Sequence, residues 1–265
     1  MREQTSVAFD KYKYYLNSVQ APTEDAAFLE KVYFDCFKKK PKVMREDFCA
    51  AFALCCAWVK RHEDFKAIGV DLDEEPLNYG KENYLAPLTD QQKDRVEIIR
   101  GDVLNTKLPS ADIICALNFS YMGFKSRKVL KDYLTKCYKD LSDEGVMVLD
   151  CFGGGSCQEP NVHETEYEGF SYFWDQDSFN HLTNEAQFYI HYQRKGEKKR
   201  EKVFSYDWRL WSLAELSDLF DEVGFSRSHI YWEGTDKDGD GDGVFTRTNE
   251  SEDCESWVAY MVAEK

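Results

Sequence analysis

The sequence predicts a single α/β domain with a doubly wound, mostly parallel sheet and an added antiparallel β cap. Over residues 41–151, short apolar runs alternate with helical patterns, which is typical of parallel strands joined by right-handed crossovers. Over residues 152–211 the pattern changes to aromatic and β-branched segments, which favour antiparallel strands. A chain of 265 residues with 43% hydrophobic residues can bury one extended core.

The first 151 residues contain the helices and strands of the parallel part. Two amphipathic helices are expected at residues 9–20 and 26–38, and Pro41 ends the second pattern. The expected parallel strands are residues 43–48, 67–70, 96–99, 113–117 and 146–151. Between them, helical patterns are found at residues 50–60, 76–84 and 128–141.

The remaining residues supply the cap and the closing elements. Strands are expected at residues 169–174, 187–193 and 202–208, with the polar segment RKGEKKRE as a hairpin tip. A capping box of Ser212 and Glu215 begins the helix 212–223, which Gly224 closes. Strands follow at 228–232 and 256–262, and we expect the acidic, glycine-rich stretch 234–255 between them to be an exposed loop.

Composition excludes several classes of function. The net charge of −15 provides no basic footprint for a nucleic acid, whereas small or cationic molecules fit it better. No apolar run is long enough for a membrane helix and no signal peptide is recognisable, so we expect a cytoplasmic protein without a membrane partner.

The cysteines and histidines do not indicate a metal centre. The nine cysteines are an odd number without a CxxC pair, so buried free thiols are expected. No Cys/His pair has metal-ligand spacing. The segment DKDGDGDG at 236–243 resembles the start of a calcium loop, but the twelfth position from Asp238 is Asn249 rather than glutamate, so no metal is expected there.

Polar residues follow the predicted parallel strands where a doubly wound sheet binds its ligands. Glu46 lies near the end of the first strand, ahead of small residues that let a ligand approach the backbone. Asp71 ends the second strand, where a carboxylate can accept hydrogen bonds from ribose hydroxyls, and Asp102 follows the third. The sequence NFSY, residues 118–121, follows the fourth strand.

Five segments, taken in order along the chain, resemble class I S-adenosylmethionine-dependent methyltransferases: REDFCAAFALCCAW, AIGVDLDEEPL, RGDVLN, ALNFSY and FSYDWRLWSLAEL. They resemble in particular a branch of this family with REDFC in its first cofactor loop. The resemblance extends over residues 9–262. It implies a seven-stranded Rossmann-like methyltransferase sheet and S-adenosyl-L-methionine as cofactor. It also divides the single domain into N-terminal helices (1–40), a cofactor-binding half (41–151), a substrate cap (152–211) and a closing helix with strands (212–265).

The resemblance assigns the cofactor contacts by position. Asp71 corresponds to the ribose ligand, with Leu72 as a further contact, and Asp102 with Val103 to the adenine contact. The residues implied around the methionine part are Glu46, Phe48, Cys49 and Ala50. The chain departs from the family where Phe48, Ala50 and Phe52 stand at positions usually held by glycine.

The NFSY segment resembles the family's amine-methylating motif, an amide or acid followed by two prolines and an aromatic residue, although both prolines are missing. The resemblance implies catalytic roles for Asn118, whose oxygen would orient an amine, and for Tyr121, whose ring would stack on the acceptor. Alternatively, Asn118 caps the strand and contacts the cofactor.

Aromatic residues of the cap and the closing strands are candidates for the acceptor pocket, and Glu233 and Asp207 could supply a countercharge. The expected substrate-binding residues are Tyr121, Trp174, Tyr206, Trp208, Trp211 and Trp232.

Three functions are therefore weighed. The leading hypothesis is methyl transfer from S-adenosylmethionine to a small molecule, at an amine nitrogen. A non-catalytic methyltransferase-like binding or partner subunit is the alternative, favoured by Phe48 and Phe52 in the cofactor loop. A nucleotide-dependent oxidoreductase is disfavoured because GxGxxG is absent.

Overall fold

The main sheet of the protein has eight strands in the order β11-β10-β12-β5-β4-β1-β2-β3. The structure is a computed structural model that describes residues 8–237, 241–252 and 254–265. β1 to β5 are mutually parallel where they pair, and β12 runs antiparallel to both β5 and β10. The strands are β1 (Val43–Asp47), β2 (Lys66–Asp71), β3 (Val96–Arg100), β4 (Ala111–Ala116), β5 (Leu141–Gly153), β10 (Arg227–Thr235), β11 (Gly241–Thr248) and β12 (Trp257–Glu264).

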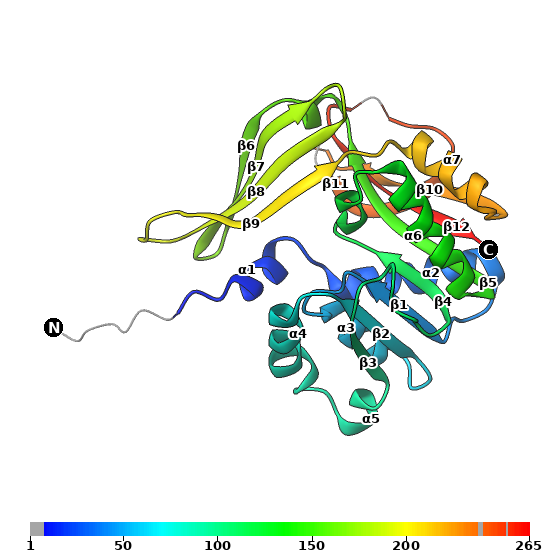
Figure 1. Ribbon diagram of the computed structural model, residues 1–265. Helices are drawn as coiled ribbons and strands as arrows, with labels where there is room; N and C mark the ends of the chain where they lie inside the picture. The colour runs from blue at the N-terminus through cyan, green and yellow to red at the C-terminus, as the bar shows by residue number, and fades with distance from the viewer. Residues whose placement is uncertain (1–7, 238–240, 253) are drawn as a thin grey trace.

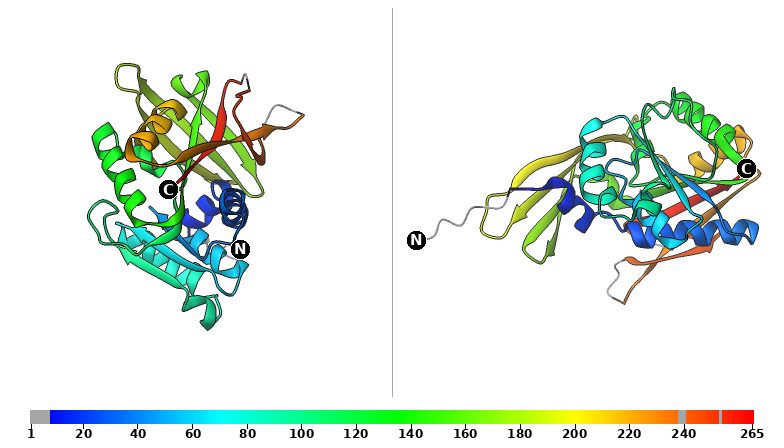
Figure 2. Two further views of the ribbon diagram at one scale, coloured as in Figure 1. Left: turned by 90° about the vertical axis from the view of Figure 1, so that its right-hand side faces the viewer. Right: turned by 90° about the horizontal axis from the view of Figure 1, so that it is seen from below.

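Helices cover both faces of the main sheet, so two hydrophobic cores form (Figures 1 and 2). α2 (Pro22–Phe37) and α3 (Ala53–Arg61) bury their apolar residues on one face. α6 (Arg127–Asp140) and α7 (Leu213–Val223) do so on the other. The shorter helical segments are α4 (Glu74–Gly80), the π-helical turn η1 (Lys81–Leu85), α5 (Asp90–Lys93) and the 3₁₀ turns η2 (Ser120–Gly123) and η3 (Gly155–Gln158).

A second, antiparallel sheet of four strands, the cap, projects from one end of the main sheet (Figure 1). Its strands, in spatial order, are β6 (Asn161–Tyr167), β7 (Phe170–Asn180), β8 (Glu185–Arg194) and β9 (Arg200–Arg209). Long strands rich in aromatic residues allow this sheet to form a ring-lined face without a helix behind it. The cap enters the chain directly after β5, so its base lies beside the carboxyl ends of the parallel strands.

The first helix, α1 (Lys11–Ser18), connects the cap to the parallel half. Its Tyr14 and Tyr15 rings contact Phe170 and Phe204 of the cap at centroid distances of 4.8 Å. On the other side, Tyr79 of α4 donates a 2.8 Å hydrogen bond to the Asp10 carboxylate, which also caps α1. The N-terminal segment therefore bridges the two parts of the fold at the carboxyl ends of the strands (Figure 2).

The structure confirms the doubly wound sheet and the antiparallel cap, and it corrects the strand count from seven to eight. The prediction that residues 234–255 form a loop is wrong, because β11 pairs with β10 inside this stretch. Phe245 of β11 packs on Phe28 and Tyr260, which gives an otherwise polar strand an apolar contact. β6 was also not predicted, since its residues are mostly exposed and show no apolar alternation.

The capping box of Ser212 and Glu215 at the start of α7 is present, and Gly224 closes the helix with φ +107°. Among the described residues, no helix has both the length and the apolar character needed to span a membrane.

Gly80 yields a prediction about how α4 packs against the turn that follows β1. A Cβ atom at this position would lie 2.2 Å from the Ala51 carbonyl oxygen and 2.5 Å from the Phe52 ring. We expect Gly80→Ala to lower the free energy of unfolding by about 2 kcal/mol, although alanine normally stabilises a helix relative to glycine. Gly155→Ala is the matched control, because no heavy atom lies within 4 Å of a Cβ there. Equal stability of the two variants in urea denaturation would contradict this packing.

Candidate functional site

The turn between β1 and α3 adopts a backbone conformation that normally requires glycine. Phe48, Ala50 and Phe52 have φ angles of +61°, +45° and +49°, in the left-handed region. Each such residue costs on the order of 1 kcal/mol, and a bulky side chain makes the conformation rarer still. These are the three positions at which glycines were missing from the sequence, so the turn keeps its shape without them.

The two phenylalanine rings of this turn anchor it in the cores on opposite faces of the sheet. The Phe48 ring packs on Phe124 and Tyr133 at 5.6 and 5.7 Å, on the face covered by α6. Phe52 is completely buried on the face covered by α2 and α3. Burying a phenylalanine contributes about 2 kcal/mol, so ring burial offsets the backbone strain.

Asp71 at the end of β2 ties the turn to the neighbouring strand. Its carboxylate accepts a 2.7 Å hydrogen bond from the Ala50 amide and a 2.8 Å bond from the Asp73 amide. Burial raises the pKa of Asp71, while these backbone donors oppose the shift. The next residue, Leu72, is a large apolar side chain with 68% of its surface exposed, suited to cover a planar ligand.

Asp102 and Val103 follow β3 at the same edge. The Asp102 carboxylate accepts hydrogen bonds of 2.9 Å from the Leu104 amide and 2.5 Å from the Asn105 side chain. Val103 is buried in the core beneath it. The structure thus places the carboxylates of Asp71 and Asp102 at the ends of the paired strands β2 and β3.

Three carboxylates, here called the acidic cluster, lie near the ends of β1 and β5: the buried Glu46 and Asp150 and the partly buried Asp25. Burial raises the pKa of Asp25 to about 6, of Glu46 to about 8 and of Asp150 to about 7, and the Asp25 charge contributes to the other two shifts. Asp25 accepts a 3.1 Å hydrogen bond from Tyr260, and Glu46 accepts one of 3.2 Å from the Cys55 thiol.

Within the described part of the chain, none of these three carboxylates pairs with a lysine or arginine. Burying anionic groups without a cation is costly. Burial without a cation therefore favours the protonated forms of these groups, which is the cause of the raised pKa values.

The residues that follow β4 form a tight turn held by Asp150. Asn118 and Phe119 both have left-handed φ angles, +54° and +57°. The Asp150 carboxylate accepts hydrogen bonds from both of their backbone amides, at 2.6 and 2.9 Å. Within the described residues, the Asn118 side-chain amide makes no hydrogen bond to the protein, so it remains available to a ligand.

The aromatic face of the cap meets this turn. Phe119 contacts Phe152 at 4.6 Å and Trp208 at 6.1 Å between ring centroids. Trp208 in turn packs on Tyr206 at 4.4 Å and on Trp174 at 6.3 Å.

Tyr15 of α1 brings a hydroxyl to the same face, close to that of Tyr206. Burial and the nearby Asp150 carboxylate raise the pKa of Tyr15 to about 12. Three predicted acceptor residues, Trp174, Tyr206 and Trp208, are therefore brought together next to Asn118 and Asp150.

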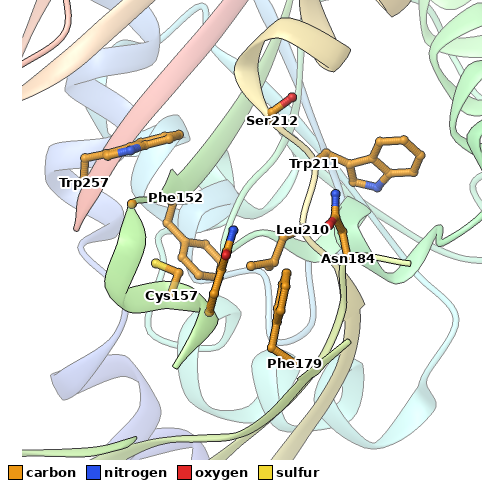
Figure 3. Close-up of a pocket in the computed structure, with 11 residues that line it drawn as sticks. Phe152, Cys157, Phe179, Asn184, Leu210, Trp211, Ser212 and Trp257 are labelled. Atoms are coloured by element: carbon orange, nitrogen blue, oxygen red, sulfur yellow. The ribbon is translucent and has the colours of Figure 1, made fainter. Parts of the chain in front are cut away.

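Other predicted acceptor residues lie elsewhere. Tyr121 is completely buried in the core, with its hydroxyl beside the Cys151 thiol, and offers no surface to a ligand. The indole nitrogen of Trp211 donates to the Phe124 carbonyl at 3.2 Å, and Trp232 packs on Trp257 at 5.0 Å. Trp211 and Trp257 help to line a separate cavity of about 160 Å³ at the base of the cap (Figure 3).

The two countercharges suggested by the sequence are engaged in other contacts. Asp207 forms a 2.5 Å ion pair with Lys125, and Glu233 accepts a hydrogen bond from the Gly243 amide. Sequence reasoning instead missed Asp25, Asp150 and Tyr15. Asp150 was detectable in principle, as a charged residue that interrupts the apolar run VMVLDCF.

A group with metal-ligand chemistry lies at the far end of α2, where Cys36, His229 and Glu264 place one ligand atom each within 4.8 Å of one another. These residues are distant in sequence, so spacing could not reveal them. His229 and Glu264 share a 2.5 Å hydrogen bond, and the Arg247 cation lies near Cys36. The polar atoms of Cys36, His229 and Glu264 thus already have partners within the protein.

Comparison with known proteins gives no match to a protein-family model and none to a curated protein. Solved structures do match over nearly the whole chain. An S-adenosylmethionine-dependent methyltransferase from Clostridium acetobutylicum is 14% identical, with a TM-score of 0.67 and coverage of 96% of both chains. The chain has the fold of an S-adenosylmethionine-dependent methyltransferase.

Two further structures with this fold belong to methyltransferases that are named for a sugar acceptor. CalS10, an amino pentose methyltransferase from Micromonospora echinaspora determined with S-adenosylmethionine bound, is 12% identical, with a TM-score of 0.65 and coverage of 96% of this chain and 98% of that one. The sugar N-methyltransferase KedS8 from a Streptoalloteichus species is 15% identical, with a TM-score of 0.63 and coverage of 100% and 98%.

The acidic cluster generates a prediction about stability. Glu46 has an ordinary pKa of 4.5 when unfolded and about 8 when folded, so its folded state binds more protons between these values. The free energy of unfolding should therefore fall as pH rises from about 4.5 to about 8, by up to about 1.4 kcal/mol per pH unit. Glu46→Gln removes this contribution, whereas Glu97→Gln, at an exposed position of β3, should retain it. Urea denaturation across this pH range measures the difference. Parallel curves for wild type and Glu46→Gln would contradict the assignment.

Proposed function

We propose that this protein is an S-adenosylmethionine-dependent methyltransferase that acts on an amine nitrogen of a small molecule. The observation that carries the proposal is the acidic cluster, whose carboxylates lack a protein cation and adjoin an aromatic face at the ligand-binding edge of the sheet. Both the cofactor, with its positively charged sulfur and amino group, and an amine acceptor would bring positive charge to this place.

The residues at the sheet edge fit the cofactor. The left-handed turn at Phe48 to Phe52 keeps the backbone shape of a glycine-rich loop, with the rings directed into the cores. Asp71 would hold the ribose, exposed Leu72 and Asp102 would hold the adenine, and Glu46 would face the methionine part. Bound S-adenosylmethionine would supply a methyl group that its positively charged sulfur already activates.

The acceptor side would lie between the Asn118–Phe119 turn and the cap. The Asn118 side-chain oxygen would accept a hydrogen bond from the amine N–H and so direct the nitrogen lone pair. Phe119, Tyr206 and Trp208 would exclude water and present ring faces to the charge that develops on nitrogen. Catalysis would then depend on orientation and desolvation more than on a strong base.

The amine acceptor is also supported by two proteins of similar structure, the amino pentose methyltransferase CalS10 and the sugar N-methyltransferase KedS8. Tyr121, Trp211 and Trp232 are left out of the proposed acceptor site because of where the structure places them. A small molecule, rather than a nucleic acid, is expected as the acceptor because the net charge is −15.

We expect Asp71→Ala to weaken binding of S-adenosylhomocysteine by roughly 1 to 3 kcal/mol, since ribose hydroxyls would lose a buried acceptor. Asp71→Asn, which keeps one acceptor oxygen, should have a smaller effect. Asp94→Ala, at an exposed residue at the end of α5, is the control and should leave affinity unchanged. Titration calorimetry measures all three, with melting temperatures to confirm folding. An affinity unchanged by Asp71→Ala would place the ribose elsewhere.

The acceptor class is tested by a methyl-transfer screen over amines, phenols, thiols and carboxylates, with S-adenosylhomocysteine release as the readout. We expect turnover with primary or secondary amines, and we expect quaternary ammonium compounds to inhibit without being methylated, because the ring-lined site accommodates cations. Transfer to oxygen or sulfur acceptors alone would reject the amine assignment and leave the cofactor assignment in place.

A further inference from the structure

Asp150 has a role that charge complementarity alone does not explain. Its carboxylate lies on β5, 7% exposed, beside Tyr260 in the register between β5 and β12. Both carboxylate oxygens are directed to the protein, one to the Asn118 amide and the other to the Phe119 amide. Two consecutive amides bound to one carboxylate form an anion-binding nest, here filled by a side chain of the protein itself.

The nest is needed because the turn is strained. Two successive non-glycine residues in the left-handed region cost on the order of 1 kcal/mol each. Hydrogen bonds from backbone amides to a charged carboxylate are stronger than neutral ones, so they can hold such a conformation. Phe119 is fixed additionally by its contacts with Phe152 and Trp208, whereas the hydrogen bond that holds Asn118 within the described residues is made by its backbone amide.

We propose that Asp150 is a positioning residue: it holds the Asn118–Phe119 turn in the conformation that aims the Asn118 amide at the acceptor. The inference rests on the proposed function, because Asn118 is the proposed acceptor contact. Asp150 itself need not touch the acceptor.

The same geometry makes the turn sensitive to pH. Asp150 faces Asp25 of α2, Tyr260 of β12, Tyr15 of α1, Cys115 of β4 and Tyr121 of η2, and none of these groups is a cation. Burial raises its pKa to about 7, against the opposing effect of the two amide donors. Ionised Asp150 accepts both hydrogen bonds, whereas the protonated group has one acceptor oxygen fewer. The turn is therefore held above about pH 7 and loosened below it.

The first test observes the turn directly and needs no turnover. In the full chain, the backbone amide resonances of Asn118 and Phe119 should shift together with pH, with a midpoint within about one unit of 7. Asp150→Asn should abolish this titration. Asp112→Asn is the matched control: Asp112 accepts hydrogen bonds from the Lys42 and Val43 amides, at the opposite end of the strands. That variant should leave the titration at Asn118 and Phe119 unchanged.

The second test measures the consequence for the proposed reaction. At pH 8, Asp150→Asn should lower kcat for an amine acceptor at least 10-fold while S-adenosylhomocysteine affinity changes less than about 3-fold. The wild-type kcat should rise with pH through about 7, and this rise should be absent in Asp150→Asn and present in Asp112→Asn.

The inference would be overturned if Asp150→Asn kept the kcat and the pH profile of the wild type. It would also be overturned if the Asn118 and Phe119 amides of the wild-type protein did not titrate. A large loss of cofactor affinity in the variant would also overturn it, because Asp150 would then serve the cofactor. If Asp150→Asn does not fold, the wild-type amide titration alone decides. If the Asn118 and Phe119 amides titrate but the protein transfers no methyl group, the proposed function is rejected and the role of Asp150 in the turn is retained.

Discussion

The backbone between β1 and α3 has to pass through left-handed conformations at three non-glycine residues, and the candidate site is built around this constraint. The Phe48 and Phe52 rings hold the turn from the two cores, Asp71 holds it from β2 through the Ala50 amide, and Gly80 leaves room for it beside α4. Packing of the two phenylalanine rings thus stabilises a turn conformation that glycine residues usually adopt. Its strain is offset by ring burial rather than avoided, which couples the shape of this turn to both hydrophobic cores.

Charge is the second constraint. Glu46 and Asp150 are buried and Asp25 is partly buried, without a basic partner in the described structure, so they reduce the stability of the protein once they ionise. The hydroxyl of Tyr15 on α1 lies near the Asp150 carboxylate and near the Tyr206 hydroxyl of the cap. Stability and ligand binding are therefore expected to depend on pH through the same three groups.

The sequence was informative where a feature is local. Alternating strand and helix patterns predicted the parallel strands, and their position at or after the ends of apolar strands made Asp71 and Asp102 candidate site residues. It failed where placement depends on tertiary packing: β11 becomes a strand through pairing with β10 and contact with Phe28, and the η2 turn rotates Tyr121 into the core and Phe119 outward. Asp25 and Asp150 become neighbours only when α2 packs on the end of β5. No spacing rule relates residues so far apart.

The central claim is that a turn with phenylalanines in place of glycines still forms a cofactor site. Calorimetric titration of the wild-type protein with S-adenosylhomocysteine at pH 7.5 tests it most directly, because the ligand needs the turn and does not need the acceptor. The account predicts saturable binding of one ligand per chain, accompanied by a rise in melting temperature. No heat of binding and no thermal shift at millimolar ligand would contradict it. That result would favour a non-catalytic methyltransferase-like subunit instead.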